Sequence, residues 1–271
     1  MENIELIPTG GLCNRMRAIA TSISIAQRYH ANLKIYWNNT IGLKADFSEL
    51  FEPFQIPHIE VHENKKWLYR INGRKDYLLK SAYFHFRGKV FFNYSLYREG
   101  NNIFPLTDKV RQKRLILITC YPMCEQNNMK NLFVPVPKIR KEIELVTSKF
   151  NEDTIGIHIR RTDNKTSIIN SPVSKFIELM KKEVAANPNT TFYLATDDHS
   201  VKQEITALFG NRIFIQNEDA DRNSIRGMVF SVVELFCLSK TRKIYGSYAS
   251  SYSQTAAILG GSEYIQVTKD L

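Results

Sequence analysis

The chain has 271 residues, 43% of them hydrophobic, which is enough for one large α/β domain or two small ones with sizeable cores. Its four cysteines are scattered without metal-ligand spacing, so neither a disulfide framework nor a zinc site is expected. No apolar run approaches the roughly 18 residues of a membrane span, and the start, MENIELIP, does not have the composition of a signal peptide, so we expect a cytoplasmic protein.

The formal net charge of +10 is unevenly distributed along the chain. Residues 1–150 hold 23 Lys and Arg against 13 Asp and Glu, whereas residues 151–271 hold 14 of each. The densest part is Lys65 to Arg98, where nine basic residues interleave with ten aromatic ones. Such a surface suits an anionic membrane, an acidic glycan or single-stranded nucleic acid, and the alternative is that the aromatics form the core of the first domain.

The first elements in chain order are a strand at 4–7, a turn at Gly10 and Gly11, a helix at about 14–29 and a strand at 33–37. This order predicts a βαβ unit on a parallel sheet. A further strand is expected at 115–120, and the prolines in 133–143 are typical of a connection between domains. We place the domain boundary near residue 150, to within ten residues or more, which gives domains 1–150 and 151–271.

The second half alternates strands and helices regularly. Strands are predicted at 154–159, 190–196, 212–216, 243–249 and 263–267. Between them we expect one helix capped by Ser171, one at 199–210 ended by Gly210, one at about 224–238 and one after Ser250. This alternation predicts a doubly wound parallel sheet, whose ligands bind at the carboxyl ends of the strands.

Four polar clusters fall at that predicted edge. They are Arg160 with Arg161 and Asp163, Asp197 with Asp198, the serines Ser247, Ser250, Ser251 and Ser253, and the segment NSIRG at 223–227 with Arg226. Guanidinium groups, hydroxyls and free N–H groups at a helix start are together what a diphosphate needs, so a nucleotide diphosphate is the predicted ligand.

Two other nucleotide-binding classes fit poorly. TGGLCN lacks the spacing of a dinucleotide-binding loop, the second strand ends in Asn38 and Asn39 instead of an acid, and no P-loop sequence is present. Glycosyl transfer is the interpretation that remains.

Five segments then occur in a specific order: GGLCNRM, HIRRTD, ATDD, NSIRG and GSYASSYSQTAAILGG. In this order they resemble the fucosyltransferase superfamily that contains the nodulation and core α-1,6-fucosyltransferases and the protein O-fucosyltransferases. The resemblance covers residues 154–261 and the first thirty or so residues. It implies a GT-B fold, with two Rossmann-like domains whose parallel sheets face a central cleft. It also implies a GDP-fucose donor held by the C-terminal domain, inversion at the anomeric carbon, and no required metal or other cofactor.

The same resemblance implies roles for individual residues. Arg160 matches the arginine that grips the donor β-phosphate, His158 lies beside the nucleotide, and Glu234 matches an acid that reads the guanine edge, its alternative being a glutamate on a helix surface. The implied donor site comprises His158, Arg160, Arg161, Asp197, Asp198, Arg226, Glu234, Ser250, Ser251, Ser253, Gly10, Gly11 and Asn14.

The catalytic base has no clear counterpart. The family glutamate that follows the motif corresponds to Ile168 here, and NKTSIINS contains no carboxylate. The base is then Asp163, a residue of the N-terminal domain, or none, because an oxocarbenium-like transition state needs little help from the nucleophile. The alternative role for Asp163 is an ion pair with a neighbouring arginine.

These observations predict an inverting, metal-independent fucosyltransferase that uses Arg160 and Asp163 in catalysis. We expect a bacterial enzyme of polysaccharide biosynthesis, cytoplasmic or peripheral at the inner face of the membrane. Its partners would be GDP-fucose, a glycan acceptor such as a surface or lipid-linked oligosaccharide, and an anionic membrane surface. One alternative is a transferase of the same fold with another GDP-sugar. The other is a non-catalytic basic module that binds nucleic acid or glycan, which the neutral second half and the lack of an RNA-binding motif disfavour.

Overall fold

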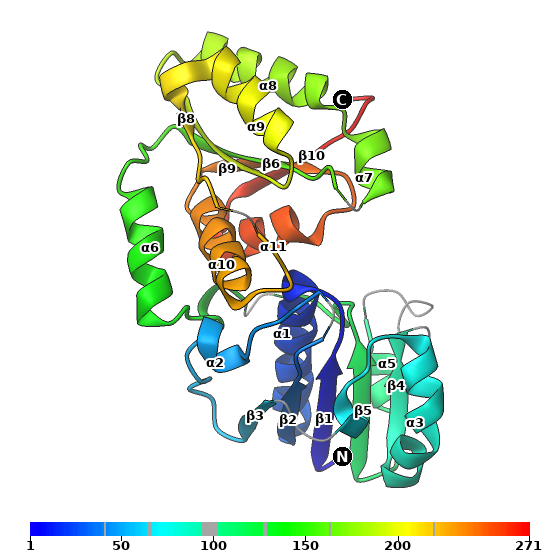
Figure 1. Cartoon of the computed structure of the whole chain (residues 1–271). Coiled ribbons are helices and arrows are strands. Elements are labelled where there is room, and N and C mark those ends of the chain that lie inside the picture. Colours follow the sequence, from blue (N-terminus) through cyan, green and yellow to red (C-terminus); the bar gives the residue numbers. More distant parts are fainter. Residues whose placement is uncertain (41, 64–66, 94–101, 127–128, 163, 219) are drawn as a thin grey trace. The chain divides into compact units, whose positions relative to one another are not determined.

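The computed structural model describes the whole chain except residues 41, 64–66, 94–101, 127–128, 163 and 219. The described residues form two compact units (Figure 1). Unit 1 comprises Met1–Val136 and Arg222–Met228, and unit 2 comprises Pro137–Asp221 and Val229–Leu271. A boundary of functional domains near residue 150 stays a prediction.

Unit 1 contains a five-stranded, wholly parallel sheet in the order β3-β2-β1-β5-β4. Its strands are β1 (Asn3–Pro8), β2 (Asn32–Trp37), β3 (Ile59–Glu63), β4 (Lys89–Phe92) and β5 (Arg114–Thr119). The predicted βαβ unit is confirmed, with helix α1 (Leu12–Tyr29) between β1 and β2. The helix begins two residues earlier than predicted because Gly11 is its N-cap residue.

Short helices and one long one complete unit 1. They are α2 (Phe47–Leu50), η1 (Trp67–Tyr69), α3 (Arg74–Arg87), α5 (Phe104–Thr107) and η2 (Met129–Asn131). Helix α3 runs beside β4 and β5 (Figure 1), and its fully buried Phe84 belongs to the same apolar cluster as Ile7, Ile116 and Ile118 of the sheet. Several aromatics of the basic segment 65–98 are therefore core residues, as the alternative interpretation predicted.

Unit 2 has a second five-stranded parallel sheet, in the order β10-β9-β6-β7-β8. Its strands are β6 (Thr154–Ile159), β7 (Thr191–Thr196), β8 (Ile213–Phe214), β9 (Lys243–Ser247) and β10 (Glu263–Val267). The helices are α6 (Pro137–Thr147), α7 (Lys165–Asn170), α8 (Val173–Ala186), α9 (His199–Phe209), η3 (Gly210–Arg212), α10 (Ile225–Ser239) and α11 (Ser251–Gly260). The predicted doubly wound parallel sheet is confirmed, although β8 has two residues instead of five. No helix in the described part of the chain has the length and apolar character needed to cross a bilayer.

The predicted capping role of Ser171 is wrong. Helix α8 begins at Val173 with Pro172 as its N-cap, and Ser171 instead follows α7, a helix that the sequence analysis missed. The Ser171 hydroxyl is buried, donates to the Val267 carbonyl at 2.6 Å and accepts the Tyr248 N–H at 2.7 Å. The Ser171 hydroxyl, which the sequence pattern assigns to a helix cap, therefore bonds to backbone groups that are distant in the sequence. Gly210 ends α9 as predicted, with φ of +53°.

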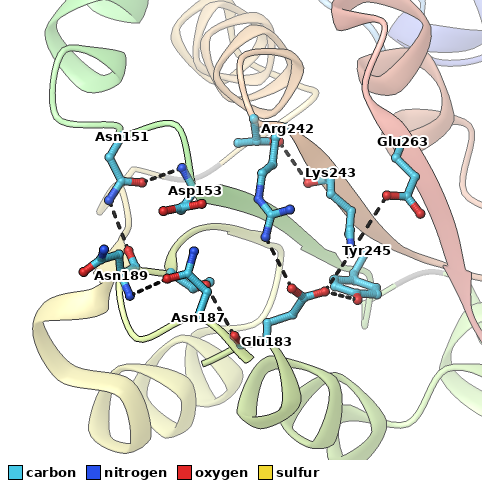
Figure 2. Close-up of polar contacts among 11 residues, drawn as sticks. Asn151, Asp153, Glu183, Asn187, Asn189, Arg242, Lys243, Tyr245 and Glu263 are labelled. Atoms are coloured by element: carbon cyan, nitrogen blue, oxygen red, sulfur yellow. Dashed lines mark hydrogen bonds and ion pairs between the residues drawn. The ribbon is translucent and has the colours of Figure 1, made fainter. Parts of the chain in front are cut away.

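A polar cluster closes the amino-terminal edge of the unit 2 sheet (Figure 2). Glu183 of α8 accepts hydrogen bonds from Lys243 Nζ at 2.8 Å and Tyr245 OH at 2.6 Å, and it pairs with Arg242 at 3.4 Å. Burial acts to raise the pKa of Glu183, but the hydrogen bonds and positive charge of Lys243 outweigh it and lower that pKa. These contacts hold the start of β9 to α8, at the end of the sheet opposite the predicted ligand edge.

Candidate functional site

The carboxyl edge of the unit 2 sheet brings together the turns that follow β6, β7 and β9. Strand β6 lies between the other two, with Ile159 opposite Thr196 and His158 opposite Gly246. Three of the four predicted clusters, those at residues 160–162, 197–198 and 247–253, therefore start from neighbouring strand ends. The fourth, at 223–227, lies in the segment Arg222–Met228 that groups with unit 1.

Two side chains from the neighbouring strands hold the backbone after β6. Asp197 Oδ1 accepts the Arg161 N–H at 2.7 Å, and Asp197 Oδ2 accepts the Thr162 hydroxyl at 2.6 Å. On the other side, Ser247 Oγ accepts the Arg160 N–H at 3.0 Å. The Asp197 carboxylate thus positions the backbone of the loop that carries Arg160 and Arg161. This role differs from direct contact with a ligand.

The two arginines of the loop have different surroundings. Arg161 Nη1 donates to the carbonyls of Ile168 and Ser171, both at 3.3 Å, and so satisfies acceptors at the end of α7. Arg160 is half-buried, and its positive charge reaches the imidazole of His158. Arg161 therefore supports the adjoining helix, and the role of Arg160 as a phosphate ligand stays a prediction.

His158 is a buried, neutral histidine at the end of β6. Only 6% of its surface is exposed, and its ring lies 5.0 Å from that of Tyr252 at an angle of 30°. Burial and, to a smaller extent, the positive charge of Arg160 lower its pKa to about 3, against the opposing effect of Asp197. Its Nδ1 is buried without a hydrogen-bond partner among the described residues. The site therefore contains an uncharged imidazole at neutral pH.

The turn between β9 and α11 presents a helix N-terminus to the same edge. Its backbone is held by Ser167 Oγ, which donates to the Tyr248 carbonyl at 2.6 Å, and Ala249 adopts a left-handed φ of +52°. Ser250 is the N-cap of α11, and its side chain makes no capping hydrogen bond. The first-turn N–H groups of a helix and its dipole favour an anion at this position.

The serines of this cluster divide into two kinds. Ser253 is fully buried beneath β9, where a Cβ at Gly246 would lie 2.3 Å from its Oγ. That close approach explains the glycine and makes Ser253 a packing residue. Ser250 and the half-buried Ser251 occupy the helix start and are the members suited to an anion.

Asp198 caps the following helix. Its Oδ1 accepts the N–H groups of Ser200 at 2.8 Å and Val201 at 3.3 Å, at the start of α9. The hydrogen bond from the Ser200 side chain contributes most to lowering the pKa of Asp198. Asp197 thus holds the loop after β6, and Asp198 caps α9.

Glu234 lies on α10 with 6% of its surface exposed, so the alternative of a helix-surface glutamate is wrong. Burial raises the pKa of the Tyr193 hydroxyl and of the Cys237 thiol, and the charge of Glu234 adds to both shifts. Glu234 therefore belongs to the buried side of α10, and its role in reading the guanine edge stays a prediction.

The remaining predicted residues lie in unit 1 or outside the described residues. Gly10 has φ of +77°, and the Asn14 side chain lies 3.0 Å from the position that a Cβ at Gly10 would occupy. Gly11 caps α1, and Arg226 is exposed on the first turn of α10. Asp163 lies outside the described residues, so its role stays a prediction.

Sequence analysis missed Arg15, the one basic residue of the GGLCNRM segment. Arg15 is 1% exposed, and its guanidinium donates to the carbonyls of Gly10 at 2.9 Å and Asn38 at 2.7 Å, and to the Thr40 hydroxyl at 2.5 Å. It also lies over the Trp37 ring at 5.1 Å. Burial lowers its pKa to about 9, so it remains charged at neutral pH. Arg15 lies three residues after Leu12 and four before Ile19, which is the spacing of the buried face of α1. This spacing could have predicted its burial.

Two Rossmann-like units, each with a five-stranded parallel sheet, are the architecture of the GT-B fold of glycosyltransferases. No known family model matches the chain.

The chain is similar to solved fucosyltransferase structures over nearly its whole length. NodZ α-1,6-fucosyltransferase, in crystals soaked with GDP-fucose, matches with a TM-score of 0.68 and 16% identity, over 96% of this chain and 93% of NodZ. A variant of Arabidopsis thaliana FUT1 in complex with GDP matches with a TM-score of 0.62 and 12% identity, over 97% of this chain and 69% of FUT1. POFUT1 in complex with GDP matches with a TM-score of 0.57 and 12% identity, over 99% of this chain and 98% of POFUT1. The predicted GT-B fold of the fucosyltransferases is confirmed.

Proposed function

We propose that the protein is an inverting glycosyltransferase that transfers fucose from GDP-fucose to a glycan acceptor. The observation that carries the proposal is the loop after β6, which bears Arg160 and whose backbone is fixed on both sides by Asp197 and Ser247. This arrangement occurs in a fold shared with structures crystallised with GDP or GDP-fucose.

In this proposal Arg160 and the start of α11 bind the diphosphate. Negative charge grows on the β-phosphate as the bond to fucose breaks, and a guanidinium held by a rigid loop stabilises that charge more in the transition state than in the ground state. The helix start supplies N–H donors to the same group. The leaving diphosphate is thus compensated by the chain's own residues, and we propose that no metal is required.

Asp163 is the proposed base, and a residue of the N-terminal domain is the alternative. An oxocarbenium-like transition state with early departure of the leaving group also allows the hydroxyl to attack with little assistance. Neutral His158 can donate or accept a hydrogen bond but cannot supply a positive charge at neutral pH.

We propose that Glu234 selects guanine, because a carboxylate can accept both N1–H and the 2-amino group, a donor pair that adenine and uracil lack. No identified residue reads the missing 6-hydroxyl of fucose, so a transferase for another GDP-sugar is the second candidate. We further propose a bacterial, cytoplasmic enzyme acting on a surface or lipid-linked oligosaccharide, with acceptor recognition in domain 1–150 and donor binding in domain 151–271.

A thermal-shift panel of GDP, GDP-fucose, GDP-mannose, UDP and ADP tests the proposal. We expect stabilisation by GDP and GDP-fucose and much smaller shifts with UDP and ADP, since at equal concentration a ligand that binds the folded state more tightly stabilises it more. A larger shift with GDP-mannose than with GDP-fucose would favour the second candidate. No shift with any guanine nucleotide would contradict both.

A further inference from the structure

Helix α3 carries an apolar face that points away from its own unit. Leu79 is 83% exposed and Phe86 92% exposed, and Leu78 and Tyr83 are also exposed. At about 100° per residue these four side chains span roughly 140° of the helix surface. The opposite side contains buried Lys80 and Phe84, which pack toward the sheet. We call the four exposed residues the α3 face.

The α3 face is unusual within the described residues. The other helices of this part of the chain each expose at most one large apolar side chain, such as Leu145 on α6 and Leu208 on α9. Trp67, 67% exposed, lies beside α3, since Lys80 Nζ donates to the Trp67 carbonyl at 2.8 Å and lies 4.9 Å from its ring. The α3 face is therefore an exposed apolar surface of the kind that marks an interaction site.

The charges around the α3 face indicate what covers it. Arg70, Arg74, Lys75 and Lys89 are exposed and form no ion pair with the described residues. The single acid of α3, Asp76, accepts the Asn72 N–H at 2.9 Å and so serves the start of the helix. A second copy of the chain would bring these positive charges together, whereas an anionic bilayer attracts them and accepts apolar side chains.

We propose that the α3 face docks on an anionic membrane surface, with Leu79 and Phe86 inserted at the headgroup boundary and the basic residues at the lipid phosphates. This inference rests on the proposed function only in that docking would bring the enzyme to a lipid-linked acceptor. The binding itself needs neither donor nor acceptor.

Cosedimentation with phosphatidylcholine vesicles, with and without phosphatidylglycerol, tests the docking. We expect binding to the anionic vesicles only, and its loss when the ionic strength rises from about 0.1 M to about 1 M, because the Debye length falls from about 10 Å to about 3 Å. Absence of binding to anionic vesicles at low ionic strength would overturn the proposal.

Paired variants separate the apolar and electrostatic contributions. Leu79→Glu with Phe86→Glu should weaken vesicle binding at least about tenfold, since each insertion buries a large side chain. Arg74→Glu with Lys75→Glu should weaken it by a similar factor, at about fivefold or more per charge. The matched control is Leu145→Glu on α6, a 69% exposed leucine, and it should bind as the wild type does.

Other outcomes identify other occupants. Binding that needs the basic residues but not Leu79 and Phe86 would indicate a soluble polyanion and contradict insertion. A wild-type dimer that the Leu79→Glu, Phe86→Glu variant converts to a monomer, without vesicle binding, would indicate self-association. Circular dichroism verifies folding of each variant, and fucosyl transfer to a soluble acceptor is measured separately, so failure of docking and failure of the proposed function give different results.

Discussion

The Asp197 carboxylate lies 2.7 Å from the backbone nitrogen of Arg161, so a residue that follows β7 fixes the loop that follows β6. The neighbouring acid, Asp198, caps α9 instead. The two adjacent carboxylates therefore have separable roles, although the sequence assigns them together to the donor site.

Replacing each acid separately tests that separation. Asp197→Ala leaves the Arg161 N–H without its acceptor, and we expect a loss of transfer activity of at least about tenfold together with a destabilisation of about 1–3 kcal/mol. Asp198→Ala removes a helix cap and should destabilise by about 0.5–2 kcal/mol with a much smaller change in kcat. Chemical denaturation and steady-state kinetics measure both. Equal kinetic defects would show that both acids contact the substrate.

The arginine pair provides a second comparison. Arg160→Lys keeps the charge but loses the planar fork, and we expect kcat to fall at least about a hundredfold, about 3 kcal/mol, with GDP affinity less affected. Arg161→Lys should mainly reduce stability, since its partners are the Ile168 and Ser171 carbonyls. Activity should persist in EDTA. Nearly wild-type turnover of Arg160→Lys would make Arg160 structural, and chelator-sensitive turnover would reveal a metal.

Guanine selection should depend on Glu234. Glu234→Gln replaces one carboxylate oxygen by a donor group, so we expect the preference for GDP over UDP and ADP to fall by about tenfold or more, about 1.4 kcal/mol. Isothermal titration with the three nucleotides measures the preference. An unchanged preference, in a variant that is still folded, would place guanine recognition elsewhere.

His158 should make the wild type sensitive to mild acid. Because its pKa is lowered to about 3 in the folded state, the unfolded chain binds a proton near pH 6.5 that the folded chain does not. The contribution of His158 to the free energy of unfolding is therefore complete above about pH 6.5. It decreases as the pH falls, by about 1.4 kcal/mol per pH unit, or about 2 kcal/mol between pH 6.5 and 5. The stability difference between wild type and His158→Asn should shrink over this range. A difference independent of pH would mean that the histidine is not buried neutral.

Arg15 should contribute more to stability than an exposed arginine of the same helix. Arg15→Met leaves the carbonyls of Gly10 and Asn38 without their buried donor, and we expect a destabilisation of about 2–4 kcal/mol. Arg28→Met, also on α1, removes an exposed pair with Asp108 at 3.4 Å and should change stability far less. Urea unfolding of both variants gives the comparison, and similar midpoints would contradict the anchoring role.

The sequence predicted unit 2 well because its central strands are buried on both faces and read as continuous apolar runs, as in 154–159 and 191–196. It failed at α7, whose six residues KTSIIN have too short an apolar pattern, and whose N-cap is Asn164. In unit 1, the strands β3 and β4 lie at the sheet edges and are only partly buried, so their patterns are weak.

The candidate site was predictable in position but not in the role of each side chain. Polar residues after strand ends indicated the edge, because parallel strands end together there. The hydrogen bonds from Arg161 to the end of α7 join residues seven and ten positions apart across a loop, and no local pattern encodes them. The burial of Arg15 likewise depends on Trp37 and Asn38, which lie more than twenty residues away.

Both tryptophans of the chain, the buried Trp37 and the exposed Trp67, belong to unit 1. Tryptophan fluorescence therefore follows the unfolding of unit 1 alone, whereas far-ultraviolet circular dichroism follows the helices of both units. Coincident denaturation curves from the two methods would mean that the units unfold as one cooperative system, and separated curves would give each unit its own stability without any label.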